Sequence, residues 1–145
     1  MTENASYQIE ERTPTLAEYQ ALCTAVGWES VINFEVAQRA LDRSLYGIVV
    51  LSEGEAVGMG RIVGDGAIFF YLQDIAVIPS HQGRGVGRLI LDKLIAYLQA
   101  NAPEQAFIGL FAANGTTSFY ERFGFVQHEG LTGMFQVVPR ARSTR

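Results

Sequence analysis

The sequence predicts an α/β (α+β) fold, with a mixed, mostly antiparallel sheet that carries helices on both faces. Several strand-like runs joined by short turns precede residue 79, and turns this short join antiparallel neighbours. A glycine-rich loop then opens an amphipathic helical run, and a further strand-like run follows it. That last order is typical of a right-handed crossover between two parallel strands. At 145 residues, the chain has the length of one domain.

The N-terminal third is predicted to hold one short strand and two helices. Residues 7–10 alternate in polarity, as a strand does. Thr13 or Thr15 would cap the first helix, with Pro14 near its first position, and Gly27 would end it. A second, shorter helix is expected over residues 34–41. The first helix carries apolar residues at helical spacing: Leu16, Tyr19, Leu22, Cys23 and Val26.

A meander of three strands is predicted next, over residues 45–51, 56–63 and 67–78, with turns at 53–55 and 64–66. A helix over 86–99 has an apolar stripe that would pack on the sheet. A strand over 106–111, a short helix over 115–123 with Gly124 at its C′ position, and an edge strand at 136–138 complete the domain. The domain is expected to cover residues 1–139, and the basic tail 140–145 is expected to be disordered.

Composition excludes several classes of protein. Hydrophobic residues make up 48% of the chain, which is enough for a packed core. The net charge of −4 argues against a nucleic-acid partner that needs a broad basic face. No run reads as a signal peptide or a membrane span, so a cytoplasmic protein is expected. The lone Cys23 allows no intrachain disulfide, and two histidines without paired ligands predict no metal.

The most informative stretch is the loop from Gln82 to Gly87, which reads Q-G-R-G-V-G. Glycines let the backbone approach a ligand, and the free amides of a helix N-terminus favour an anion such as a pyrophosphate. A P-loop would need a Lys after the glycines, which is missing here. A Rossmann fingerprint would need a third glycine where Arg88 stands. The pattern that fits is Q-x-x-G-x-G.

This pattern, with a second block FAANGTTSFYERFGF at residues 111–125, resembles the GNAT superfamily of N-acetyltransferases. The resemblance covers about residues 45–135. It implies a GNAT fold whose central parallel strands splay apart, and acetyl-CoA as the cosubstrate. It also implies transfer of the acetyl group to a primary amine by direct attack in a ternary complex.

The resemblance assigns the cosubstrate to two stretches of the chain. Backbone groups of Ile75, Ala76 and Val77 would pair with the pantetheine arm like an added strand, and one N–H would polarise the thioester. Asn114 would bond the pantetheine or cap the short helix. One arginine of the loop would add a charge-assisted contact to phosphate. The predicted phosphate loop consists of Gln82, Gly83, Arg84, Gly85, Val86, Gly87 and Arg88.

Two residues are predicted to move protons. Tyr120 matches the family tyrosine near the sulfur of CoA, and its protonated phenol would donate to the leaving thiolate. Asp74 is the first candidate to take the proton of the amine, directly or through water. Strand alternation places Asp74 on the face opposite to Tyr71 and Gln73, unless a bulge redirects it. Members of the family often have Glu or His at the position of Tyr71 or Gln73, and this chain has neither.

The acceptor stays open at this point. The run over residues 64–87, together with GMFQVVP at 133–139, resembles the plant serotonin N-acetyltransferase-type subgroup, which implies a small amine as acceptor. A non-catalytic acyl-CoA-binding module and a protein or peptide N-acetyltransferase are the alternatives. Family members often dimerise through C-terminal strands, so a homodimer is a candidate assembly.

Overall fold

The computed structural model describes residues 6–141, which form two compact units, one up to Leu110 and one from Phe111 onward. The first unit contains a five-stranded sheet in the order β1-β2-β3-β4-β5. Neighbours from β1 to β4 are antiparallel, and β4 and β5 are parallel. The mixed sheet predicted from the sequence is therefore confirmed. Its strands are β1 (Tyr7–Glu10), β2 (Tyr46–Ser52), β3 (Glu55–Gly64), β4 (Phe69–Val77) and β5 (Phe107–Gly109).

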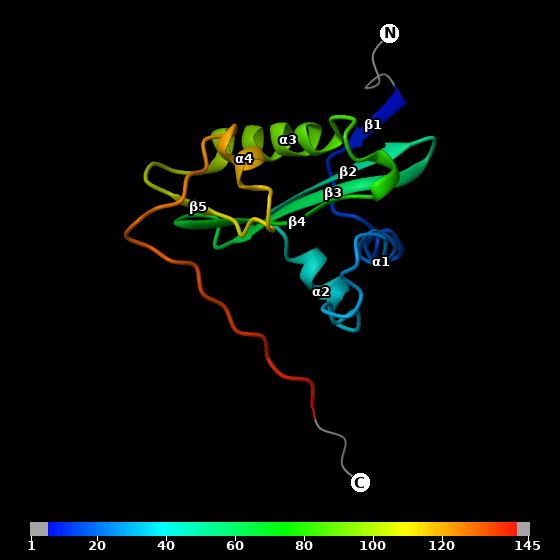
Figure 1. Ribbon diagram of the computed structural model, residues 1–145, viewed down its shortest axis with the longest axis horizontal. Helices are drawn as coiled ribbons and strands as arrows, with labels where there is room; N and C mark the ends of the chain where they lie inside the picture. The colour runs from blue at the N-terminus through cyan, green and yellow to red at the C-terminus, as the bar shows by residue number, and fades with distance from the viewer. Residues whose placement is uncertain (1–5, 142–145) are drawn as a thin grey trace. The chain divides into compact units, whose positions relative to one another are not determined.

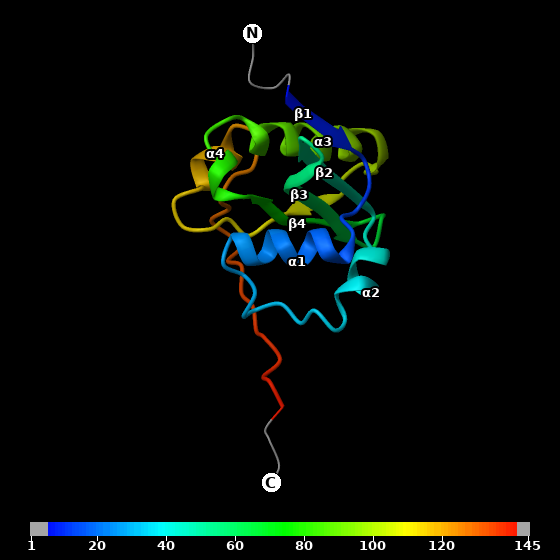
Figure 2. The ribbon, with the colours of Figure 1, turned by 90° about the vertical axis from the view of Figure 1, so that its right-hand side faces the viewer.

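Helices cover both faces of this sheet, as Figures 1 and 2 show. The long helix α3 (Val86–Asn101) lies on one face, and α1 (Leu16–Ala25) lies on the other, with α2 (Ala37–Asp42) following it. Gly60 allows α3 to pack close, because a Cβ there would lie 2.7 Å from a side-chain carbon of Ile90. On the opposite face, the neighbouring residue Met59 is buried in a cluster with α1.

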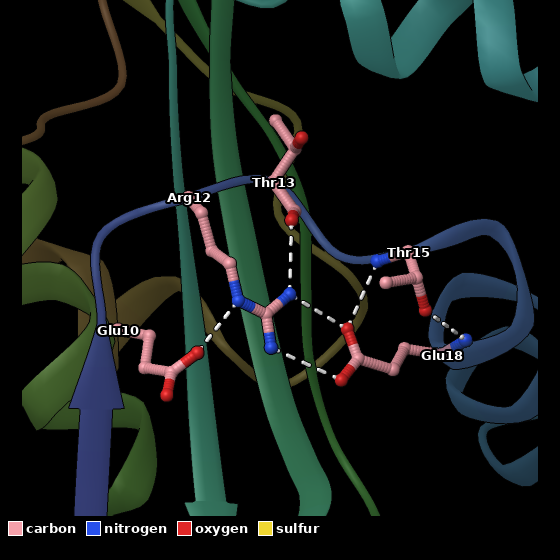
Figure 3. A network of polar contacts seen from close by, with 5 residues as sticks. All are labelled: Glu10, Arg12, Thr13, Thr15 and Glu18. Carbon is pink, nitrogen blue, oxygen red and sulfur yellow. Dashed lines mark hydrogen bonds and ion pairs between the residues drawn. The ribbon is translucent and has the colours of Figure 1, made fainter.

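A polar network holds the start of α1 (Figure 3). Thr15 is the N-cap: its hydroxyl accepts from the Glu18 amide, and the Glu18 carboxylate accepts from the Thr15 amide. Arg12 donates to both carboxylate oxygens of Glu18, at 2.8 and 3.1 Å, and to Glu10 of β1 at 2.6 Å. These charge-assisted bonds tie the first strand to the first helix, and they lower the pKa of Glu18. Of the two predicted caps, Thr15 is the one used.

The parallel pair of strands separates after a short pairing. Phe69, Phe70 and Tyr71 of β4 pair with Phe107, Ile108 and Gly109 of β5. Residues 72–77 of β4 pair with β3 only, as far as the described chain goes. This half of β4 therefore has one edge without a strand partner, as the predicted splay requires.

The second unit contains the short helix α4 (Thr117–Glu121) inside the predicted span 115–123. The edge strand predicted at residues 136–138 is wrong, because these residues belong to no strand. Val137 and Val138 are 75% and 90% exposed. A strand needs a neighbour to satisfy its backbone groups, and the unit from Phe111 onward contains none among the described residues. Of the tail predicted at residues 140–145, residues 142–145 lie outside the described part of the chain.

Candidate functional site

The glycine-rich loop joins the end of β4 to α3 through a short 3₁₀ helix, η2 (Pro79–His81). Gly83 and Gly85 have φ of 79° and 86°, a left-handed region that favours glycine, and Gly85 is the N-cap of α3. A Cβ placed on Gly83 would meet nothing within 4 Å. The loop is therefore shaped by its glycines, and its backbone is open at Gly83 for close approach by another molecule.

The amides of this loop have no partners within the protein. Along the chain from Gly83, the first backbone N–H that donates a hydrogen bond is that of Leu89, to the Gly85 carbonyl at 3.1 Å. Over the described part of the chain, no acceptor bonds to the N–H groups of residues 83–88. Six consecutive unpaired amides at the positive end of a 16-residue helix form a site for an anion. Arg84 and Arg88 are exposed beside them and form no ion pair with a described residue.

Side chains just before the glycines fix where the loop begins. The Gln82 Nε2 donates to the Val77 carbonyl at 2.9 Å, so the motif glutamine closes the turn onto β4. His81 Nδ1 lies 2.7 Å from the Tyr7 hydroxyl, which ties the turn to β1. The sequence had marked Gln82 as part of the loop, and the structure gives its side chain this bond to β4.

The end of β4 turns one set of backbone groups toward its unpaired edge. The Ile78 amide donates to the Val57 carbonyl of β3 at 2.9 Å. Because backbone groups alternate in direction along a strand, those of Val77 point away from β3. The Val77 carbonyl is occupied by Gln82, whereas its N–H has no acceptor among the described residues.

Asp74 lies at a β-bulge. Gln73 pairs with Arg61 and Ala76 pairs with Met59, so two residues of β4 stand opposite Gly60 of β3. Asp74 has a φ of 58° there. The bulge turns its side chain toward Tyr19 of α1, so simple alternation fails here. The redirection by a bulge, which the sequence had left open, is what the structure shows.

The redirected carboxylate is held by two donors. Asp74 Oδ2 accepts from Arg61 Nε at 2.7 Å and from the Tyr19 hydroxyl at 3.0 Å. Arg61 in turn donates to Ser44 Oγ at 3.1 Å. The side chains of Arg61 and Asp74 are each only 13% exposed. Asp74 Oδ1 has no donor among the described residues, and no unpartnered side-chain oxygen there is buried, so Oδ1 reaches the surface.

The pKa values of two nearby side chains, Tyr19 and Cys23, are raised in this environment. Burial and the Asp74 carboxylate raise the pKa of Tyr19, so its phenol stays protonated and remains a donor. Burial, together with the same carboxylate, raises the pKa of Cys23 to about 11. Cys23 is therefore a buried neutral thiol, as expected from the sequence.

Comparison with known proteins decides the family. The family model described as an acetyltransferase (GNAT) domain matches residues 44–127, more than half of the chain. The chain belongs to the GNAT family. It is an N-acetyltransferase, an enzyme of the acyltransferase class, and this family uses acetyl-CoA as cosubstrate.

Relatives support this assignment and carry different names. An uncharacterized N-acetyltransferase ycf52 of Pyropia yezoensis is 30% identical over 89% of this chain and 75% of its own. A histone acetyltransferase TAP1 of Glycine max is 31% identical over 81% of this chain and 55% of its own. The chloroplastic serotonin N-acetyltransferase 2 of Oryza sativa is 33% identical over 57% of this chain and 41% of its own.

The fold also matches a solved structure. A Staphylococcus aureus protein described as a probable acetyltransferase superposes with a TM-score of 0.84 and 30% identity, over 91% of this chain and 99% of its own. The GNAT fold predicted from the sequence is therefore confirmed. No helix within residues 6–141 is long and apolar enough to cross a membrane.

The remaining predicted site residues lie in the second unit. Tyr120 of α4 is half-buried, with its ring 5.1 Å from that of Phe119 and 6.5 Å from that of Phe125. Burial raises the pKa of Tyr120. Its hydroxyl forms no hydrogen bond with any described residue. Asn114 is exposed, and Thr116, not Asn114, is the N-cap of α4.

Sequence reasoning missed Tyr19 and Arg61 as partners of Asp74. Tyr19 had been placed among the apolar residues of α1, and only its hydroxyl distinguishes it from them. Arg61 carried a usable signal, since a charged residue within the otherwise uncharged run from 56 to 63 needs a partner when it is buried. Asp65, in the turn predicted at 64–66, accepts from the amides of residues 69, 67 and 68, which lowers its pKa.

Proposed function

We propose that this enzyme transfers the acetyl group of acetyl-CoA to the primary amine of a small molecule, by direct attack within a ternary complex. The observation that carries the proposal is the run of unpaired backbone donors at residues 83–88, together with the unpaired Val77 N–H at the edge of β4. Such donors fit a diphosphate joined to an amide-bearing arm. The family supplies the reaction, and these donors indicate where the donor substrate would lie.

The loop from Gln82 to Arg88 would hold the pyrophosphate. The amides of residues 83–88 would donate to its oxygens, and the dipole of α3 would stabilise their charge. Arg84 or Arg88 would add a charge-assisted bond. Gln82 would keep the loop closed onto β4 through its bond to the Val77 carbonyl.

The unpaired edge of β4 would take the pantetheine arm. Ile75, Ala76 and Val77 lie beyond the last residue paired with β5, and a ligand with two amides would add to that edge as a short strand. The Val77 N–H would then donate to the thioester oxygen, where negative charge develops as the amine attacks. Asn114 would contribute a further contact to the arm.

Tyr120 would protonate the leaving group. As the C–S bond breaks, the thiolate needs a proton, and thiols have pKa values near 8.5. The raised pKa of Tyr120 keeps its phenol protonated at neutral pH. Such a general acid contributes roughly 10²–10⁴ in rate.

Asp74 would take the proton of the acceptor. An alkylammonium resembles Lys, with a pKa near 10.4, and must lose one proton before its nitrogen can attack. Asp74 Oδ1 is the available oxygen, since Oδ2 is occupied by Arg61 and Tyr19. The proton would pass from the amine to Oδ1 through a water molecule.

A small amine is the acceptor we favour. The net charge of −4 favours cationic substrates, and a relative of this chain is named a serotonin N-acetyltransferase. Another relative is named a histone acetyltransferase, so a protein acceptor is the alternative to test. The exposed apolar residues of the C-terminal segment would support a homodimer, because surfaces of this kind favour association.

The experiment is a thiol-release assay with acetyl-CoA and a panel of arylalkylamines, polyamines, amino acids and lysine peptides. We expect release with small amines at least tenfold faster than with peptides. Calorimetry with acetyl-CoA is run alongside. Binding without release on any amine would contradict an enzymatic role, and faster release with peptides would contradict the small acceptor.

A further inference from the structure

The ion pair between Arg61 and Asp74 crosses the bulge that precedes the unpaired half of β4. Arg61 of β3 pairs with Gln73, the residue of β4 just before the bulge. Its Nε lies 2.7 Å from Asp74 Oδ2. The Tyr19 hydroxyl reaches the same oxygen from α1. We call these three side chains, Tyr19, Arg61 and Asp74, the bulge clamp.

The backbone at this bulge needs support from its surroundings. Asp74 has a φ of 58°, which residues other than glycine adopt only at a cost in free energy, although Asp tolerates it better than most. Such a conformation persists where neighbouring contacts determine it. The clamp supplies these contacts, since both donors hold a carboxylate that is 13% exposed.

The conformation of residue 74 also sets the direction of the groups that follow it. Without the extra residue, every later backbone group of β4 would exchange its direction between β3 and the free edge. With the bulge in place, the Ile78 amide meets the Val57 carbonyl and the Val77 N–H points to the free edge. The bulge therefore decides which amides a ligand can reach.

We propose that Tyr19 and Arg61 are positioning residues for acetyl transfer, acting through Asp74 to hold the bulge that turns the Val77 amide toward the thioester. This inference rests on the proposed function of the β4 edge. It gives Asp74 a role that does not depend on accepting a proton. The network joins α1, β3 and β4 at Asp74 Oδ2, and Arg61 extends it to Ser44, which follows α2.

Two substitutions of Asp74 separate positioning from proton transfer. D74A and D74G both remove the carboxylate and leave Arg61 without its partner. They differ in the backbone, because glycine adopts a positive φ at no steric cost and alanine does not. We expect D74A to bind acetyl-CoA about fivefold or more weakly than D74G by calorimetry, as relaxation of the bulge would require. D74N, which retains an acceptor for both donors, should bind nearly as tightly as the wild type.

Variants of Tyr19 and Arg61, the two donors to Asp74, provide the second part of the test. Y19F and R61M should weaken acetyl-CoA binding and lower kcat about three- to tenfold, whereas Y46F should leave both unchanged. Tyr46 is a matched control because its hydroxyl bonds Glu11, outside the clamp. Equal binding by D74A and D74G, with wild-type values for Y19F, would overturn the inference while leaving acetyl transfer itself intact.

A readout without ligand keeps this test separate from the proposed function. In ¹⁵N NMR spectra of the free protein, D74A should shift the amide signals of residues 75–77 further from their wild-type positions than D74G does. If the wild type failed to bind acetyl-CoA, the proposed function would fall, and these spectra would still test the clamp. Unchanged signals in D74A would contradict it.

Discussion

The polar groups at the two ends of the unpaired half of β4 differ in whether they have hydrogen-bond partners within the protein. At the bulge, the partly buried Asp74 has donors from two elements, and its charge is balanced by Arg61. At the glycine loop, six successive amides have no acceptor in the described chain. Polar groups that are satisfied within the protein stabilise its architecture, whereas a cluster of accessible unsatisfied donors indicates a ligand. The comparison predicts that changes at the loop affect binding, and that changes at the bulge affect both binding and folding.

The largest effect is expected from Gly85→Asp. Its carboxylate would stand where the pyrophosphate is expected, and like charges placed together cost several kcal/mol. We expect acetyl-CoA affinity to fall about 100-fold or more by calorimetry. Gly27→Asp is the matched control, because Gly27 has the same φ of 86° at the end of α1. Retained affinity in Gly85→Asp, or an equal loss in Gly27→Asp, would refute the assignment of the loop.

The next effect is expected from Tyr120→Phe. Loss of the phenol removes the proposed proton donor, so kcat should fall about 100-fold while acetyl-CoA affinity stays within about twofold. Steady-state kinetics with calorimetry separates the two quantities. Tyr97→Phe is the control, since Tyr97 stacks on Tyr46 in the first unit. An unchanged kcat would make Tyr120 a packing residue only.

Arg61→Met should destabilise the protein as well as weaken binding. It leaves Asp74 largely buried without its cation, and breaking a buried pair costs roughly 3–5 kcal/mol. Because both side chains keep 13% exposure, we expect a loss of about 2–3 kcal/mol in the free energy of unfolding. Urea denaturation measures it. A loss below about 0.5 kcal/mol would show that the pair behaves like a surface ion pair.

A smaller effect is expected where neither region is touched, at Glu18. The folded state lowers the pKa of this carboxyl below its ordinary value of 4.5, chiefly through the hydrogen bond from Arg12. Its contribution to stability is therefore complete above that value and is lost as pH falls through the folded pKa. Glu18→Gln keeps the capping geometry and removes the charge. Denaturation midpoints should converge between mutant and wild type as pH drops below about 4.5. A gap that stays constant with pH would contradict this.

Much of the fold followed from local sequence patterns. The short turns at 53–55 and 64–66 required antiparallel neighbours, and the glycine loop required a helix after it. The strand expected at 136–138 failed, because apolar character alone does not supply a pairing partner. Local patterns predict elements well where a turn or cap fixes their ends, and poorly where a strand depends on a distant neighbour.

The candidate site was predicted unevenly for a similar reason. Gln82 and the glycines are contiguous, so their joint role is visible in the sequence. The partners of Asp74 are 55 and 13 residues away, at Tyr19 and Arg61. A bulge that reverses the side-chain direction changes which residues meet, and alternation cannot anticipate it. Only the folded chain brings these three side chains to one oxygen.

The most direct test of the account is an NMR titration of ¹⁵N-labelled protein with CoA. We expect the amide signals of residues 83–88 and of Val77 to show the largest shifts and to gain protection from hydrogen exchange, because these donors acquire acceptors for the first time. The signals of residues near Thr15 and Glu18 should stay in place. Saturating CoA that left the amides of 83–88 unshifted and unprotected would contradict the central claim that this loop is where the diphosphate binds.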